Sequence, residues 1–97
     1  MMPKDIPLYF SNTVIDDNGL EHEELVTLEE LSELQKEITK HLRGKGDLRS
    51  IISEIADVYI CLSHLQTGMF ISDREINEAI MMKTERYFER RERGDTK

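Results

Sequence analysis

An all-α fold is predicted by three features of this 97-residue sequence. From Leu20 onward, apolar residues recur at steps of three and four, which is the spacing of one face of a helix. Both prolines lie within the first seven residues, so the rest of the chain carries no proline to interrupt a helix. The composition is rich in Leu, Ile, Glu, Lys and Arg, which favour helix. We predict an antiparallel helical hairpin plus a third helix, forming a helical bundle completed by oligomerisation.

The hairpin is predicted from two helical segments separated by a glycine-rich turn. The first segment begins near Leu20, and its apolar positions at helical spacing include Leu28, Leu31, Ile38 and Leu42. Gly44 and Gly46 interrupt it, and Asp47 has a side chain suited to cap the next helix. The second segment is mostly apolar and is expected to end at Gly68. A link this short joins antiparallel neighbouring helices.

The flanking regions complete the predicted organisation. Residues 1–19 are rich in turn-forming residues, and we predict an irregular N-terminal arm with a strand-like segment. A third helix is expected to begin at Ser72, which has capping-box spacing with Glu75. The residues expected on its inner face include Ile76, Ala79, Ile80 and Tyr87. Residues 20–93 then form a single all-α domain, and residues 94–97 form a tail.

Charge and cysteine content restrict the partners that the chain can have. The formal net charge is −7, which argues against non-specific binding to nucleic acid or to an anionic membrane. No apolar run approaches the length of a membrane span, and the N-terminus lacks the apolar block of a signal peptide. Cys61 is the only cysteine, so no internal disulfide can form. We expect a cytoplasmic protein whose small core favours self-association.

Two acids in the apolar second segment are the most informative residues. Glu54 and Asp57 are the only acids between Leu48 and Leu65, and their spacing of three places them on one side of a helix. A carboxylate that borders apolar surface is costly unless it is paired or holds a metal. These two acids therefore indicate a metal site, and salt bridges to Lys or Arg of another helix are the alternative explanation.

The first segment carries a matching pair of acids, Glu30 and Glu33. In an antiparallel hairpin this pair can face Glu54 and Asp57 at the same level. Four carboxylates at close range repel, and at neutral pH they need protons or cations to coexist. Ligation by oxygen alone suits Mg²⁺, or Mn²⁺ as its substitute, rather than zinc. We predict a Mg²⁺ site here, while an ordinary solvated helix face remains the alternative for Glu30 and Glu33.

The pattern Glu-Glu-x-x-Glu followed by Glu-x-x-Asp resembles the all-α nucleoside triphosphate pyrophosphohydrolases, the MazG-like superfamily. The resemblance covers about residues 25–90, which include the segments EELSELQKEI, SEIADVYICL and MMKTERYFERR. It implies an all-helical, Mg²⁺-dependent enzyme that cleaves an NTP or dNTP between the α and β phosphates, giving NMP and pyrophosphate. It also implies a homo-dimer or homo-tetramer in which a neighbouring chain often completes the site.

Individual site residues follow from the same resemblance. The metal ligands carried over are Glu30, Glu33, Glu54 and Asp57. Glu29 fills the first acidic position and could assist or orient, while Lys83 and Arg86 match basic positions that approach the substrate phosphates. Water attacks the α-phosphorus, and we expect Glu33 or Glu30 to accept its proton. Glu85 stands where some dCTP-preferring relatives have Asn, so the sequence does not predict a preference for dCTP.

Two other functions are compatible with the residues. A non-catalytic acidic helical module for dimerisation or protein interaction would show no response to divalent metal. A phosphoribosyl-ATP pyrophosphatase belongs to the same superfamily and has similar acids, so only a panel of substrates separates it from the first hypothesis. A ferritin-like di-metal oxidase is disfavoured because neither acidic pair extends to a Glu-x-x-His.

Overall fold

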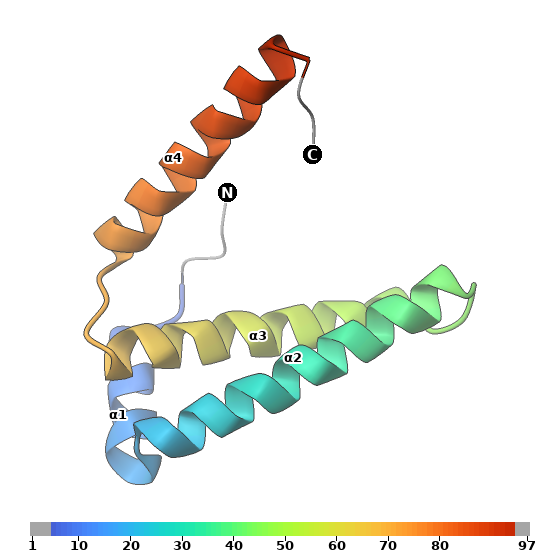
Figure 1. Cartoon of the computed structure of the whole chain (residues 1–97). Coiled ribbons are helices and arrows are strands. Elements are labelled where there is room, and N and C mark those ends of the chain that lie inside the picture. The colour runs from blue at the N-terminus through green and yellow to red at the C-terminus, as the bar shows by residue number, and fades with distance from the viewer. Residues whose placement is uncertain (1–4, 95–97) are drawn as a thin grey trace.

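The computed structural model describes residues 5–94, and in this range the chain is all-helical (Figure 1). Its four helices are α1 (Leu8–Asn18), α2 (Leu20–Leu42), α3 (Leu48–Gly68) and α4 (Asp73–Glu92). The prediction of an all-α fold is therefore confirmed for the described residues. None of these helices combines the length and the apolar character that crossing a bilayer requires. Of the tail predicted at 94–97, residues 95–97 lie outside the described range.

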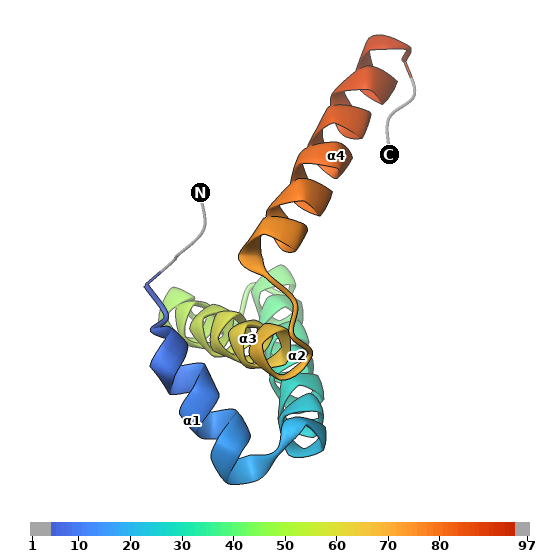
Figure 2. The same cartoon turned by 90° about the vertical axis from the view of Figure 1, so that its left-hand side faces the viewer.

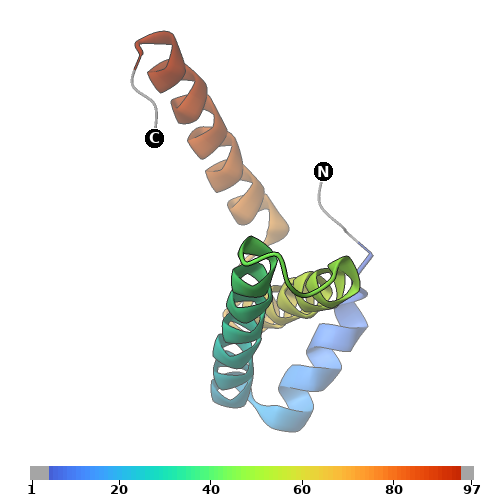
Figure 3. The same cartoon turned by 90° about the vertical axis from the view of Figure 1, so that its right-hand side faces the viewer.

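The predicted hairpin is formed by α2 and α3, which run side by side in opposite directions (Figures 1 and 3). The turn between them uses the two expected glycines, since Gly44 and Gly46 both have positive φ, at 75° and 78°. Asp47 caps α3, because its carboxylate accepts a 2.9 Å hydrogen bond from the backbone N–H of Ser50. These local signals fix where α2 ends and where α3 begins.

The N-terminal arm corrects the sequence analysis, because residues 8–18 form a helix rather than an irregular or strand-like segment. Pro7 stands at the N-cap, where its missing N–H costs nothing, and Gly19 ends the helix with φ at 85°. The turn formers that suggested irregular structure lie on the exposed side of α1. α1 packs across the end of the hairpin, mainly against α3 (Figure 2), and this packing outweighs local propensity.

Gly68 marks a close approach at that end of the hairpin. A Cβ atom at this position would lie 2.7 Å from the Leu20 side chain and 3.1 Å from that of Ile15. The absence of a side chain therefore allows the start of α2 and the end of α1 to reach the last turn of α3. This glycine, expected only to end a helix, also sets the packing of three helices.

The last helix, α4, begins as predicted but packs differently. Ser72 and Glu75 form a complete capping box, and Gln66 donates a 2.9 Å hydrogen bond to Asp73 at the start of the helix. Beyond that point α4 extends away from the other three helices in every view (Figures 1–3). Its expected inner face is exposed, with Ile80 at 44% and Tyr87 at 49%. One chain alone therefore does not close a four-helix bundle.

The interior of the chain is polar, and much of its apolar surface lies outside. The buried side chains of the described residues are Ser11, Glu23, Thr27, Cys61 and His64, and only the cysteine is apolar. The accessible surface is 7940 Å², whereas a compact monomer of this mass exposes about 5,800 Å². The radius of gyration is 16.2 Å, against about 12.5 Å for a compact domain of this length. The fold is therefore open for its size.

Candidate metal centre

Three of the four predicted metal ligands meet between α2 and α3. Glu30 projects from α2, and Glu54 and Asp57 project from one side of α3 because they are three residues apart. One carboxylate oxygen from each residue lies within 4.8 Å of the other two. All three residues are half-buried, so their charges are partly withdrawn from solvent. The antiparallel hairpin places these acids opposite one another, as the sequence predicted.

The electrostatics of this cluster favour a bound cation or proton. Partial burial raises the pKa of Glu30, and the charges of Asp57 and Glu54, together with hydrogen bonds to both, raise it further. The Oε2 atom of Glu54 is buried and accepts no hydrogen bond from the residues that the structure describes. A buried carboxylate oxygen without a partner is unfavourable. A divalent cation would supply the missing partner and relieve the repulsion among the three acids.

The salt-bridge explanation of Glu54 and Asp57 finds no support within the described part of the chain. Ion pairs there join His22 to Glu23, Lys40 to Glu37, and Arg74 to Glu78. None of these pairs includes an acid of the cluster. Among residues 5–94 the donor set is therefore three carboxylates that are not ion-paired, which suits a hard cation such as Mg²⁺ or Mn²⁺.

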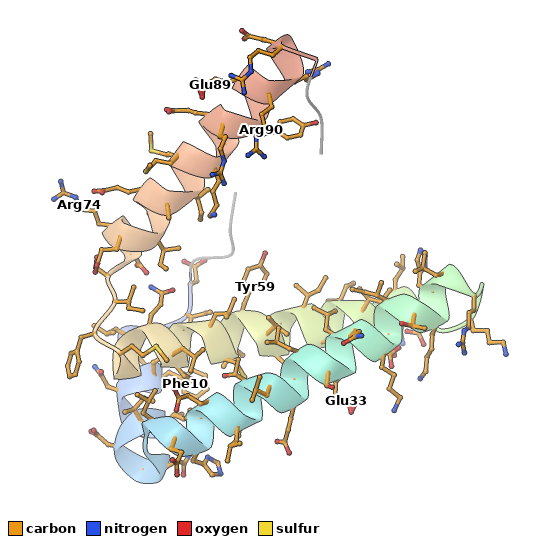
Figure 4. The ribbon with its side chains drawn as sticks, viewed as in Figure 1. Phe10, Glu33, Tyr59, Arg74, Glu89 and Arg90 are labelled. Atoms are coloured by element: carbon orange, nitrogen blue, oxygen red, sulfur yellow. The ribbon has the colours of Figure 1, made fainter. Side chains whose placement is uncertain are left out.

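The fourth predicted ligand, Glu33, lies one turn further along α2 and is exposed. Figure 4 shows it projecting from α2 away from α3, and its carboxylate is not part of the three-residue group. Glu29, on the same helix, is exposed as well. The two pairs of acids therefore do not face each other symmetrically. Glu30 faces both acids of α3, whereas Glu33 lies outside the cluster.

The two predicted phosphate-binding residues are not near the carboxylates within one chain. Lys83 and Arg86 are exposed on α4, which makes no extensive contact with α2 or α3 (Figures 1 and 2). A site that combines these cations with the three carboxylates would need α4 from a second chain or a movement of α4.

A polar stripe continues from the cluster along the inside of the hairpin. On α2, Glu23, Thr27 and Glu30 follow one another at steps of four and three, and on α3 so do Asp57, Cys61 and His64. Burial raises the pKa of the Cys61 thiol, a hydrogen bond with Thr27 offsets this in part, and the charges of nearby carboxylates raise the pKa further. Sequence reasoning identified only the acids near Glu30. The same helical spacing, applied to polar residues, would have found the rest.

Comparison of the chain with family models, curated proteins and solved structures finds no match. No family is assigned on that ground. The chemistry of the carboxylate cluster therefore carries the functional argument.

Proposed function

We propose that this chain is a Mg²⁺-dependent nucleoside triphosphate pyrophosphohydrolase that cleaves an NTP or dNTP between its α and β phosphates. The observation that supports it most is the cluster of Glu30, Glu54 and Asp57, with one buried oxygen that has no partner. The cluster supports a divalent cation, and the resemblance over residues 25–90 supplies the reaction. Carboxylate-bound Mg²⁺ with open positions commonly holds substrate phosphates.

In this proposal, Glu30, Glu54 and Asp57 hold the ion. When bound, Mg²⁺ neutralises phosphate charge and lowers the pKa of a coordinated water. The exposed carboxylate of Glu33, one turn from Glu30, is free to accept the proton of the attacking water. Glu30 is the alternative acceptor, because its raised pKa brings it closer to neutrality.

The cationic part of the proposed site comes from a second copy of the chain. The chain exposes roughly 2,000 Å² more than a compact monomer of its mass, which is in the range that one partner buries in an obligate dimer. Apolar residues contribute to this excess on α4, where Ile80 and Tyr87 are exposed beside Lys83 and Arg86. Packing α4 on the hairpin of another chain would bury the apolar residues and bring the cations toward the triphosphate.

The exposed apolar surface also supports a second candidate, an acidic helical module for dimerisation or protein interaction. That candidate accounts for Leu28 and Ile52, which are 64% and 65% exposed, without requiring catalysis. It does not account for a half-buried group of three carboxylates. The two functions differ in whether divalent metal affects the protein.

The test is release of pyrophosphate from a panel of NTPs, dNTPs and phosphoribosyl-ATP in the presence of Mg²⁺. Wild type should release pyrophosphate from at least one substrate, while Glu54→Gln and Asp57→Asn should lose activity by at least about a hundredfold, as expected when a metal-binding group is removed. Glu21→Gln, an exposed change near the start of α2, is the matched control and should retain activity. Inertness of wild type across the panel, or full activity in both ligand variants, would refute the proposal. Orthophosphate as the product would show that another bond is cleaved.

A further inference from the structure

One buried contact between α1 and the hairpin is centred on a histidine. Ser11 is fully buried, and its Oγ lies 2.8 Å from Nδ1 of His64 and 2.9 Å from Oγ of Ser63. The ring of Phe10 packs against the imidazole nearly at a right angle, with centroids 5.1 Å apart. His64 itself is only 4% exposed. α1 is therefore docked through a buried polar contact.

Apolar packing contributes at the other end of α1, where Ile15 is half-buried and lies beside Gly68 of α3. At the start of the helix, Leu8 and Tyr9 face solvent, with 68% and 74% of their surface exposed, so the contact with the hairpin there is made by Phe10 and Ser11. We propose that the Ser11–His64 contact is an acid-sensitive latch, which holds α1 against the hairpin at neutral pH and loosens it as the medium is acidified. The proposal does not depend on the metal site, because the latch lies at the opposite end of the polar stripe.

The groups around His64 determine how it responds to pH. α1 presents the neutral Ser11 and Phe10, and α3 itself presents Ser63. α2 presents the one described group whose charge acts on the imidazole, Glu23, and this carboxylate already accepts hydrogen bonds from Asn18 and His22. Burial lowers the pKa of His64 below its ordinary value of 6.5, and the charge of Glu23 offsets this only in part.

The sign of the effect follows from linkage. The released state, with its solvated imidazole, binds the proton more tightly than the docked state does. Docking is therefore at full strength above pH 6.5, the ordinary pKa of histidine, and weakens as the pH falls toward the lower pKa of the docked state. For each unit by which the His64 pKa in the docked state lies below that in the released state, the equilibrium constant for docking of α1 falls by about tenfold at low pH.

Two measurements on the full-length protein test the latch. NMR titration of the imidazole signals should give His64 a pKa below 6.5, its ordinary value, and the difference between the two values measures the effect of burial. Hydrogen exchange, corrected for the intrinsic rate at each pH, should show that protection of the α1 amides falls between pH 7.5 and pH 5 by about tenfold per unit of that pKa difference. Protection of the central turns of α2 and α3 should change less.

Variants separate titration of His64 from other effects of acid. His64→Asn keeps an amide near the position of Nδ1 and should remove most of the pH dependence of α1 protection. Ser11→Ala removes the hydrogen bond and should lower protection already at pH 7.5. A His64 pKa of 6.5 or higher in the wild type would overturn the latch, and this holds even if a variant fails to fold. Equal loss of α1 protection in wild type and His64→Asn would overturn it as well.

Discussion

At the scale of single residues, Glu30 is the position where stability and function oppose each other. Its pKa is raised because it is partly buried and faces Asp57 and Glu54. At neutral pH without metal, the folded state therefore holds a repulsive arrangement that a cation would relieve. Glu54 adds a buried oxygen without a partner. Groups that destabilise a fold unless a ligand is bound are typical of binding sites.

The first prediction concerns Glu30→Gln. Removing one of three clustered negative charges should raise the melting temperature of the metal-free protein, because the repulsion decreases. The same change should abolish stabilisation by Mg²⁺. Glu29→Gln, which neutralises an exposed acid on the same helix, should leave both quantities unchanged. Thermal unfolding in EDTA and in millimolar Mg²⁺ measures both effects. A lower melting temperature for Glu30→Gln in EDTA would contradict this account.

The second prediction is the pH dependence of the metal-free protein. The folded pKa of Glu30 is raised above its ordinary value of 4.5, so the folded state binds this proton more tightly than the unfolded state does. The contribution of Glu30 to the free energy of unfolding should therefore increase as the pH falls through the raised pKa toward 4.5, and it should level off below 4.5. Urea unfolding of wild type and Glu30→Gln across this range measures this contribution as the difference between their free energies of unfolding. A constant difference from pH 7 to pH 4.5 would contradict the prediction.

At the scale of helices, the features that could be predicted from the sequence are those determined by interactions between residues close together in the chain. The starts of α3 and α4 were predicted because Asp47 and Ser72 cap them through hydrogen bonds to residues only three positions away. α1 was missed because its turn formers are exposed and its helical state depends on packing against α3. The position of α4 was not predicted for a related reason. Helical spacing identifies an apolar face, but it does not indicate whether that face packs within its own chain or against another chain.

The third prediction concerns the cap of α3. Asp47→Ala removes the acceptor for the backbone N–H of Ser50 and should lower the free energy of unfolding by about 1 kcal/mol. For a chain of this length, that corresponds to a decrease of roughly 4–8 °C in melting temperature. Asp47→Asn, which can still cap the helix, should lose much less. Equal losses in both variants would show that capping is not the cause.

At the scale of the whole molecule, the chain has its polar residues inside and much of its apolar surface outside. Four of the five buried side chains in the described range are polar, while Leu28, Ile52 and Met82 are more than 60% exposed. This distribution is unfavourable for an isolated chain, because buried apolar area is the main favourable term in folding. A second copy that covers these faces would make the assembly, rather than the chain, the stable unit.

The fourth prediction tests whether the site is shared between chains. Sedimentation or light scattering should give a mass at least twice the 11.4 kDa of the chain. Glu54→Gln and Lys83→Ala should each be inactive in releasing pyrophosphate. Mixing equal amounts of the two after unfolding and refolding should restore about a quarter of wild-type activity, because half of randomly formed dimers combine both chains and one of their two sites is intact. No recovery on mixing would contradict a shared site.

We propose that the three carboxylates between α2 and α3 bind a divalent cation, and thermal unfolding across a Mg²⁺ titration measures this binding. The metal-free wild type should gain about 2.7 kcal/mol in free energy of unfolding when Mg²⁺ reaches one hundred times its Kd. Glu54→Gln and Asp57→Asn should show no such gain. A wild-type melting temperature that is indifferent both to millimolar Mg²⁺ and to EDTA would contradict the claim.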